Sequence, residues 1–293
     1  AIHSYANRRK LTCGAFLLNN SLVSMYVKCG DILQAENVLY MLPRRDVVSW
    51  SAILSIYVEY GEGEKALISY VQMQNEGVDP DKVSCILALQ ACACLAEKEL
   101  ICFVEEGEIK RKSLEIGQAL KSDLTKKGYI SDKRVATALI GMYGKCGVIY
   151  EAECVFDEVI HRDLVSWNAM LSAYVERGNG AKALRLYRHM LDEGVTPDDL
   201  TSVISLQACG LLVQEKGDIL SDDLKLIALD IGRALHVDVL CSNNFTLDVF
   251  IGTTLLDMYS KCGAIEDAED VFCNLLERTA ISWVAMLSAY VEQ

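Results

Sequence analysis

The sequence predicts an all-α fold, a right-handed superhelical solenoid of stacked helix-turn-helix repeats. Three observations support this prediction: short phrases recur at a period near 117 residues, apolar residues recur at helical spacing within each period, and the 293 residues include only three prolines. One helical hairpin cannot bury both of its apolar faces, whereas hairpins stacked in a row bury them against their neighbours. Such a stack has a concave side that a ligand can occupy.

The long period is visible in four separate phrases. Two of them recur at spacings of 117 and then 116 residues: Ser49-Trp50, Ser166-Trp167 and Ser282-Trp283, and Met25-Tyr26, Met142-Tyr143 and Met258-Tyr259. Two others recur once, 117 residues apart: the Gln-Ala-Cys phrases that begin at Gln90 and Gln207, and Pro80 with Pro197. This agreement predicts an array of related units.

Each long period divides into three kinds of unit. The first kind has 31 residues, at 16–46, 133–163 and 249–279. The second has 35 residues, at 47–81 and 164–198, with a further copy beginning at 280–293. The third is longer, at 82–132 and 199–248, and residues 1–15 have the pattern of the end of another such unit.

Helix, turn and second helix follow one another within a unit. In the unit at 47–81, one helical face carries Trp50, Ile53, Leu54 and Tyr57, and a second carries Ala66, Leu67, Tyr70 and Met73. We expect Gly61 and Gly63 to interrupt the helix between these faces, and Gly77 and Pro80 to end the second helix. The unit at 164–198 repeats every one of these features.

The composition favours a large buried core without a membrane span. Hydrophobic residues make up 52% of the chain, yet no apolar run reaches the length of a transmembrane helix. The twelve cysteines include Cys29, Cys146 and Cys262, each in a Lys-Cys-Gly phrase, and we interpret these as reduced packing residues. A net charge of −13 argues against a broad basic face, although it leaves room for a narrow binding groove. The chain begins and ends within the repeat pattern and therefore reads as a fragment.

The repeated phrases resemble those of the pentatricopeptide repeat family, in its plant subclass where P-, L- and S-type units alternate. The phrases that carry the resemblance are Asn20–Gly30, Arg45–Trp50, Gly77–Asp81, Thr137–Gly147, Arg162–Trp167, Gly194–Asp198 and Thr253–Gly263. The chain then reads as the end of an L unit, S-P-L-S-P-L-S, and the start of a P unit. A tetratricopeptide array is the alternative, but its constant period of 34 residues and its Trp-x-x-Leu-Gly phrase are absent.

The resemblance implies binding of single-stranded RNA, one base per repeat. In such proteins the fifth and last residues of a unit select the base; here these pairs are Asn20 with Asp46, Ser51 with Asp81, Thr137 with Asp163, and Asn168 with Asp198. Asn with Asp tends to select U, and Ser or Thr with Asp tends to select G. The implied preference is U-G-x-G-U-x, with a weak purine bias at Thr253, whose unit ends in Thr279, and none at Val284.

Other positions fit the same expectation less uniformly. The apolar second residues Leu17, Val48 and Val165 would sandwich bases, whereas Arg134 departs from the pattern. The fifth residues of the long units, Ile86 and Val203, cannot form hydrogen bonds, which agrees with the family's long units usually reading no base. The simpler alternative is that the Asn, Ser, Thr and Asp side chains only cap helices.

Several features remain open to more than one interpretation. Lys28, Lys145 and Lys261 recur at one position and would either contact phosphates or complement a helix dipole. The long units carry extra sequence at 98–112 and 213–227, which would lengthen helices, form a loop or bind a partner.

The sequence offers no catalytic motif. Phosphate-binding glycine phrases are absent, Cys92-Ala-Cys94 lacks zinc-ligand spacing, and the four histidines are scattered. We therefore expect no enzyme activity, metal or cofactor in this chain; the family's deaminase-like domain would follow it. The resemblance implies a chloroplast or mitochondrial location, an organellar transcript as ligand, protein partners in an RNA-editing complex, and no membrane. A protein-interaction scaffold is the alternative function.

Overall fold

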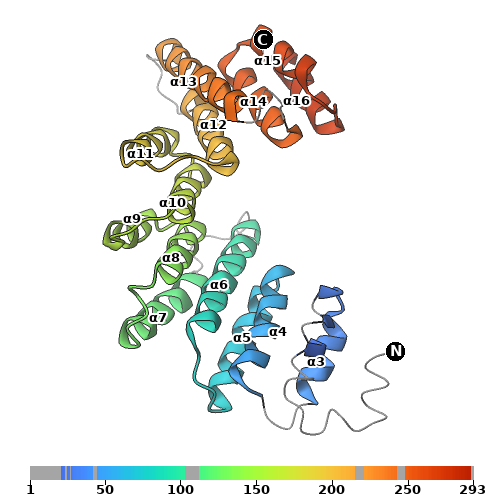
Figure 1. The fold of residues 1–293 in the computed structure, drawn as a ribbon, viewed down its shortest axis with the longest axis vertical. Helices are drawn as coiled ribbons and strands as arrows, with labels where there is room; N and C mark the ends of the chain where they lie inside the picture. Colours follow the sequence, from blue (N-terminus) through green and yellow to red (C-terminus); the bar gives the residue numbers. More distant parts are fainter. Residues whose placement is uncertain are drawn as a thin grey trace. The chain divides into compact units, whose positions relative to one another are not determined.

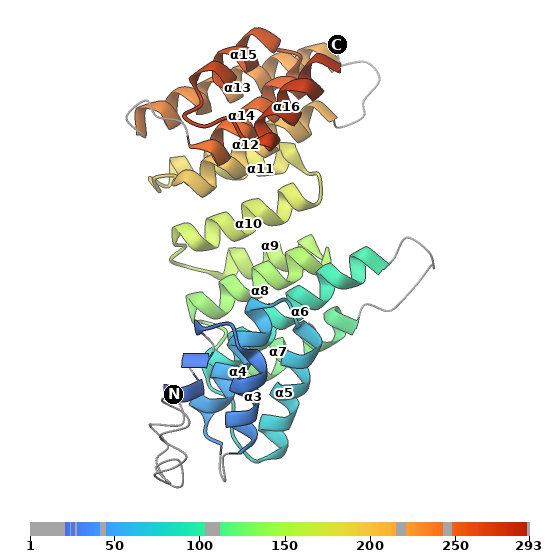
Figure 2. The same cartoon turned by 90° about the vertical axis from the view of Figure 1, so that its right-hand side faces the viewer.

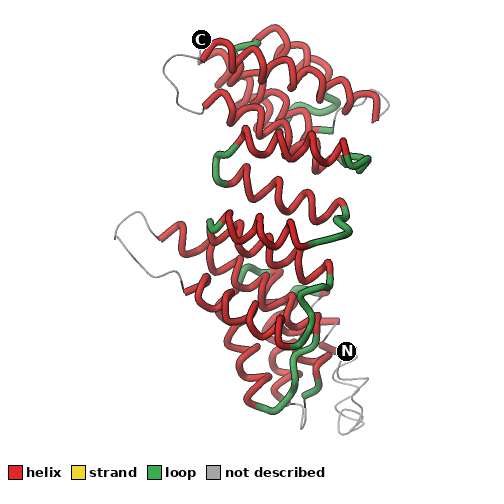
Figure 3. The backbone as a smooth tube through the Cα atoms, turned by 90° about the vertical axis from the view of Figure 1, so that its left-hand side faces the viewer, coloured by secondary structure: helices red, strands yellow, loops and turns green. Residues whose placement is uncertain are grey.

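The structure is a computed structural model that describes residues 21–23, 25–26, 28–41, 45–102, 112–214, 221–242 and 248–291. Within these ranges the regular structure is entirely helical, with no strand (Figure 3). The predicted all-α repeat fold is therefore confirmed. The chain divides into two compact units, Ala1–Val159 and Ile160–Gln293, and each is described by itself.

The first unit is a stack of helical hairpins (Figure 1). Its helices are α3 (Ile32–Tyr40), α4 (Val47–Glu59), α5 (Gly63–Asn75), α6 (Lys82–Cys102), α7 (Lys112–Lys126), α8 (Lys133–Cys146) and α9 (Ile149–Glu158). Helices α4, α6 and α8 pack against one another in that order, while α5, α7 and α9 each pack on the helix that precedes them. The first helices of successive hairpins thus form one layer and the second helices cover it.

The second unit repeats this arrangement (Figure 2). Its helices are α10 (Leu164–Glu176), α11 (Gly180–Asp192), α12 (Asp199–Gln214), α13 (Ser221–Ser242), α14 (Val249–Cys262), α15 (Ile265–Asn274) and α16 (Ala280–Val291). Here α10, α12, α14 and α16 form the layer of first helices, and α11, α13 and α15 pack on them. No described helix is long and apolar enough to cross a membrane.

Two of the three repeated tryptophans anchor the cores of their units, whereas Trp283 is half exposed. Trp50 and Trp167 are 0% exposed. The guanidinium of Arg45 lies 5.5 Å from the Trp50 ring centre, and that of Arg162 lies 5.7 Å from the Trp167 ring centre. Each arginine also pairs with a glutamate just past the second helix of the hairpin that follows it, Glu76 or Glu193. One Arg-Trp-Glu arrangement therefore ties the first helix of a 35-residue hairpin to the end of its second helix.

Glycines permit the closest helix contacts, which corrects part of the sequence interpretation. Gly61 and Gly178 have positive φ and follow the first helices, as expected of turn residues. Gly63 and Gly180 instead begin α5 and α11. A Cβ at Gly63 would lie 2.5 Å from the carbonyl oxygen of Ala91, and one at Gly180 would lie 2.5 Å from that of Ala208. The recurrent Gln-Ala-Cys phrase thus lies where the second helix meets the next hairpin.

The Lys-Cys-Gly phrase ends the first helix of the 31-residue hairpins. Gly147 and Gly263 adopt the left-handed conformation that closes α8 and α14. Cys146 and Cys262 are buried, as predicted, but Cys29 is exposed, so the packing interpretation is wrong for that residue. The ten cysteines whose side chains the structure describes are free thiols.

Part of each insert lengthens a helix. Residues 98–102 continue α6, which spans 21 residues, and Ser221 begins α13, which spans 22. The rest of the inserts, at 103–111 and 215–220, lies outside the described residues, as do Leu17, Asn20 and the predicted unit end at 1–15.

Candidate nucleic-acid interface

The predicted base-reading residues lie at the starts of the first helices. Ser51, Thr137, Asn168 and Thr253 lie in the first two turns of α4, α8, α10 and α14. The four terminal aspartates precede first helices: Asp46 and Asp163 are the N-caps of α4 and α10, and Asp81 and Asp198 stand immediately before α6 and α12. Hydrogen-bonding side chains are therefore placed at the same end of successive first helices.

Asn168 and Asp198 come together as the pairing predicts. The amide Nδ2 of Asn168 donates to Oδ1 of Asp198 at 3.1 Å. Thr201 completes the arrangement, because its Oγ1 lies 2.7 Å from Oδ1 of Asn168 and 2.6 Å from Oδ1 of Asp198. Its backbone N–H also donates to Asp198 at 2.8 Å. Both the amide and the carboxylate are held in fixed orientations by this buried threonine.

The same contacts keep Asp198 ionised. Partial burial raises the pKa of its carboxyl group, but hydrogen bonds from the side chain and backbone of Thr201 and from Asn168 outweigh that effect. The pKa of Asp198 is consequently below its ordinary value. The carboxylate therefore acts as an acceptor at neutral pH, which fixes Nδ2 as the atom of Asn168 that faces it.

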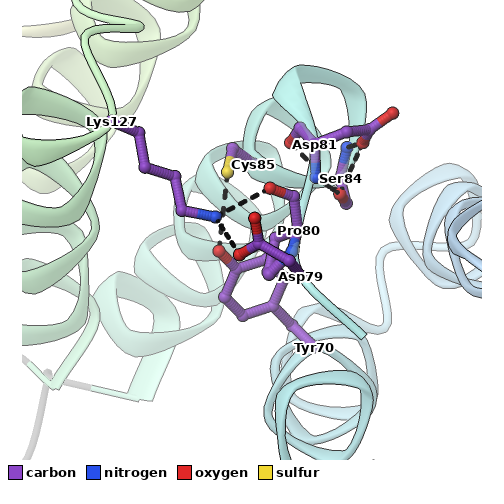
Figure 4. Close-up of polar contacts among 7 residues, drawn as sticks. All are labelled: Tyr70, Asp79, Pro80, Asp81, Ser84, Cys85 and Lys127. Atoms are coloured by element: carbon purple, nitrogen blue, oxygen red, sulfur yellow. Dashed lines mark hydrogen bonds and ion pairs between the residues drawn. The ribbon is translucent and has the colours of Figure 1, made fainter. Parts of the chain in front are cut away.

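Ser51 and Asp81 are placed in the same way but form no described hydrogen bond with each other. The Asp81 carboxylate accepts from the backbone N–H and the hydroxyl of Ser84, at 2.9 and 2.6 Å (Figure 4). The hydroxyl of Ser51 is buried without a hydrogen-bond partner. Serine is shorter than asparagine and does not bridge to the carboxylate. A buried hydroxyl without a partner is costly, so this group is suited to an incoming hydrogen-bonding ligand.

A lysine from a distant helix holds the loop before Asp81. Lys127, just past the end of α7, donates to the carboxylate of Asp79 at 2.5 Å and to the carbonyl of Pro80 at 2.8 Å (Figure 4). Tyr70 and Cys85 lie beside this loop, with the phenol oxygen 3.5 Å from Sγ. Burial raises the pKa of both groups. The sequence interpretation assigned no role to Lys127, because nothing in its local pattern separates it from an ordinary exposed lysine.

Asn20 lies outside the described residues, and Thr137 and Asp163 belong to different units, each described by itself, so these two predicted pairs stay predictions. Thr137 lies in the first unit, where its hydroxyl donates to the Lys133 carbonyl at 2.9 Å, whereas Asp163 belongs to the second unit. Asp163 caps α10 through the backbone N–H of Ser166 at 3.0 Å. The hydroxyl of Thr253 donates to its own helix, at Phe250.

All four aspartates cap the helix that follows them. Asp46 accepts from the backbone N–H of Ser49 at 2.8 Å, as the others do from Ser84, Ser166 and Thr201. Capping is thus a real function of these residues. It uses Oδ1 in each case, and in Figure 4 the second carboxylate oxygen of Asp81 points away from the cap. Capping orients the carboxylate and is compatible with a further role.

Exposed apolar side chains flank the same helix starts. Val48 is 56% exposed and Val165 is 63% exposed, so both are accessible for stacking against a ligand. The structure adds four exposed apolar residues that occupy the second position of other units and that the sequence analysis did not single out: Val83, Leu200, Phe250 and Ile281. These four residues could have been found from the sequence, because each is the second residue of its unit, as Val48 and Val165 are. Arg134 is also exposed.

The recurring lysines are engaged with carboxylates. Lys145 pairs with Glu97 of α6 at 2.6 Å, and Lys261 pairs with Asp257 at 2.7 Å. Both lie in the last turn of a first helix, where a cation also complements the helix dipole. Lys28 is exposed.

A separate apolar groove lies between α5 and α7 of the first unit. It has a volume of about 700 Å³ and is lined chiefly by Leu67, Ile68, Val71, Leu95, Ile116 and Leu120. The described residues hold no cluster of three or more His, Cys, Asp or Glu side chains placed to bind a metal.

Repeated helical hairpins with matched polar side chains at their first-helix starts define the chain as a helical-repeat protein. A profile described as the PPR repeat family matches residues 162–210, and a PPR repeat profile matches residues 20–47, 48–78, 135–164 and 253–278. These matches together cover more than half of the chain, which therefore belongs to the pentatricopeptide repeat family.

Relatives of known name and structure agree with this assignment. A chloroplastic pentatricopeptide repeat-containing protein of Arabidopsis thaliana is 31% identical over 97% of this chain and 41% of its own length. A mitochondrial one from the same plant is 31% identical over 94% and 39%. The chain thus spans about two fifths of these relatives. The crystal structure of the pentatricopeptide repeat protein PPR10 in complex with an 18-nucleotide psaJ RNA element shares the fold, with a TM-score of 0.58 and 16% identity over 96% of this chain and 44% of that one.

Proposed function

We propose that this chain binds single-stranded RNA sequence-specifically, reading bases with the fifth and last residues of its units. The observation that carries the proposal is the Asn168–Asp198 hydrogen bond, which joins two side chains 30 residues apart in the pattern that base reading requires. One Nδ2 proton of Asn168 donates to Asp198 and Oδ1 contacts Thr201, so the second Nδ2 proton remains as a donor for a base. Exposed Val48 and Val165 supply apolar surfaces for the base faces.

The proposed preference along the chain, from 5′ to 3′, is U-G-x-G-U-x. Asn20 with Asp46 and Asn168 with Asp198 would select U; Ser51 with Asp81 and Thr137 with Asp163 would select G. The long units would leave their bases unread, in agreement with the side chains of Ile86 and Val203, which offer no hydrogen bond. Val203 is in addition buried.

The physiological setting is proposed from the relatives. Those in Arabidopsis thaliana are named as chloroplastic or mitochondrial, and PPR10 is named as an RNA complex. We infer an organellar transcript as the ligand. From the alternation of units of three kinds, which is typical of the PLS subclass, we infer a role in guiding RNA modification, chiefly C-to-U editing, or RNA processing. Partner proteins of an editing complex would act on the bound RNA.

The test is a titration of fluorescent RNAs that differ only at the base assigned to Asn168. Wild type should bind the RNA with U there more tightly than the RNA with G, and Asn168→Thr should reverse the order. Asn179→Thr is the matched control, because Asn179 makes no side-chain cap and lies at the other end of the same hairpin. Equal binding of both RNAs by wild type would refute base reading.

A protein-interaction scaffold is the second candidate, favoured by the apolar groove between α5 and α7. A scaffold would bind RNA without regard to sequence, or not at all, and Asn168→Thr would change nothing. Replacing Val71, which is half exposed in the groove, by Glu would then abolish partner binding. The same change should leave RNA selection intact if the first proposal holds.

A further inference from the structure

The 35-residue and the long hairpins begin with a buried hydroxyl at their third residue, whereas the 31-residue hairpins carry Val135 and Ile251 there. Ser49, Ser84, Ser166, Thr201 and Ser282 occupy this position and are all 0% exposed. The first four donate a backbone N–H to the aspartate that ends the preceding unit, and the hydroxyl of Ser282 donates to the carbonyl of Thr279.

The hydroxyl of Thr201 also reaches the fifth residue of the preceding unit. Its Oγ1 lies 2.7 Å from Oδ1 of Asn168, 33 residues earlier. Asn168 is only 6% exposed, so its amide is held among buried groups and not by solvent. Loss of this contact would leave an acceptor without a partner in a buried site.

The two contacts of Asn168 agree on one orientation of its amide. An amide can turn over and exchange its donor and acceptor ends. The ionised Asp198 carboxylate only accepts, which requires Nδ2 to face it. This orientation turns Oδ1 toward Thr201, whose single hydroxyl proton is shared between Asp198 and Asn168. Thr201 therefore keeps the carbonyl end occupied and leaves only an N–H for the ligand.

A fixed N–H donor discriminates between the two pyrimidines. Uracil carries a carbonyl oxygen at C4, which accepts a hydrogen bond, whereas cytosine carries an amino group there, which donates one. An amide free to turn over would present its oxygen to cytosine. An amide held with its nitrogen outward favours uracil.

We propose that Thr201 is a positioning residue that sets the preference of Asn168 for uracil over cytosine. The inference rests on the proposed function and adds the next unit's third residue to the base-reading pair. A base would then be read by three side chains from two consecutive hairpins. The corresponding junction of the first unit, between the hairpins at 47–81 and 82–132, has no such three-residue arrangement. There Ser84 contacts Asp81, while the hydroxyl of the shorter Ser51 lies without a partner.

The experiment measures affinities for RNAs that carry U, C or G at the base assigned to Asn168. Thr201→Val keeps the side-chain volume and Thr201→Ala removes it; both should lower the ratio of U to C affinity by about three- to tenfold, the worth of one hydrogen bond. Thr201→Ser restores the hydroxyl and should keep the ratio within about twofold of wild type. Thermal unfolding of every variant is recorded first.

Ser205→Ala is the matched control. Ser205 is another buried hydroxyl on α12, one turn further along, and it donates to the Thr201 carbonyl of its own helix without contacting Asn168. Its replacement should leave the U to C ratio unchanged. An unchanged ratio in Thr201→Val and Thr201→Ala, or an equal loss in Ser205→Ala or Thr201→Ser, would overturn the inference while the U over G preference of wild type still supports base reading. Absence of any U preference in wild type would overturn the proposed function and the inference together.

Discussion

His236 is a residue whose ionisation opposes folding. It lies on α13 with Nδ1 3.0 Å from the phenol oxygen of Tyr259, while Nε2 is buried without a partner. Burial lowers its pKa below the ordinary value of 6.5, an effect that nearby Asp267 only partly offsets. The folded state therefore binds this proton less tightly than the unfolded state, so stability should be complete above the unfolded pKa and fall as the pH drops below it.

Urea unfolding between pH 7.5 and 5 measures this effect. The free energy of unfolding of wild type should decrease across the lower part of that range, and His236→Gln should flatten the decrease. His161→Gln is the control, because His161 is exposed in the same unit. An equal pH slope in wild type and His236→Gln would assign the dependence to other groups.

Lys127, which belongs to the neighbouring hairpin, should support base recognition by Ser51 and Asp81. It fixes Asp79 and Pro80, the two residues before Asp81. Lys127→Met should weaken the preference for G at the Ser51 position and leave the preference for U at Asn168 unchanged. Global stability should fall by no more than about 1 kcal/mol, because Asp79 is largely exposed and such pairs are screened.

Lys126→Met is the control for Lys127→Met. Lys126 is the preceding residue, is more exposed and pairs with Asp123 on its own helix. If both variants lose G selection equally, loss of positive charge and not the clamp on the loop is responsible.

The positions of the reading residues could be predicted from the sequence, but not their contacts. The repeat pattern identified Asn168 as the fifth residue and Asp198 as the last residue of one unit. Equivalent positions of a repeat have equivalent places in the fold, so the pattern also predicted where these side chains lie. The role of Thr201 could not be predicted. In the sequence, Ser84 and Thr201 are both hydroxyl residues at the third position of a long unit, and nothing distinguishes them. Whether this hydroxyl contacts the fifth residue of the preceding unit depends on the length of that residue: Asn168 reaches Thr201, and the shorter Ser51 does not reach Ser84.

At the scale of helices, the contact of α11 with α12 should tolerate no added methyl group. A Cβ at Gly180 would lie 2.5 Å from the Ala208 carbonyl oxygen and 2.8 Å from the Leu212 backbone nitrogen. Backbone of a packed helix cannot move aside locally, so Gly180→Ala should cost about 1–3 kcal/mol. Denaturant unfolding monitored by circular dichroism measures the change.

Gly232→Ala provides the comparison, because its Cβ would meet only the flexible end of Met258 at 2.5 Å. That methionine can turn aside, and alanine gains about 1 kcal/mol of helix propensity over glycine. The net change should be near zero. A loss as large as that of Gly180→Ala would show that α13 and α14 are packed as rigidly as α11 and α12.

Helix order and type followed from the sequence more fully than helix boundaries did. Periodic apolar residues predicted the helix pairs α4 with α5 and α10 with α11, since burial of one face drives each helix to form. The first residues of α5 and α11 were read as breaks, because glycine is the usual sign of a turn. Close approach to the next hairpin, a tertiary constraint, is what keeps glycine at those positions.

At the scale of the whole molecule, charge determines how RNA binding should respond to salt. The net charge is −13, and Lys145 and Lys261 are already paired with Glu97 and Asp257. Binding to a single strand loses affinity with salt in proportion to the phosphates contacted, with a slope of about −0.7 for each in a plot of log affinity against log salt. Because the net charge is negative and these two recurring lysines are already paired, we expect a slope shallower than about −2 and a correspondingly large share of affinity from base contacts.

The double variant Lys145→Ala with Lys261→Ala decides between the two roles of these lysines. If they serve only intramolecular pairs, the slope should stay within about 0.5 of wild type, and affinity for the cognate RNA should change little. If the slope of the double variant is shallower than that of wild type by about 1.4, the value expected for two phosphate contacts, then both lysines leave their carboxylate partners and contact phosphates when RNA binds. A wild-type slope steeper than about −3, with equal affinity for unrelated RNAs, would contradict recognition through bases. Because an acidic protein gains little from phosphates, a shallow slope combined with strong sequence preference is the outcome that its charge and its reading side chains jointly require.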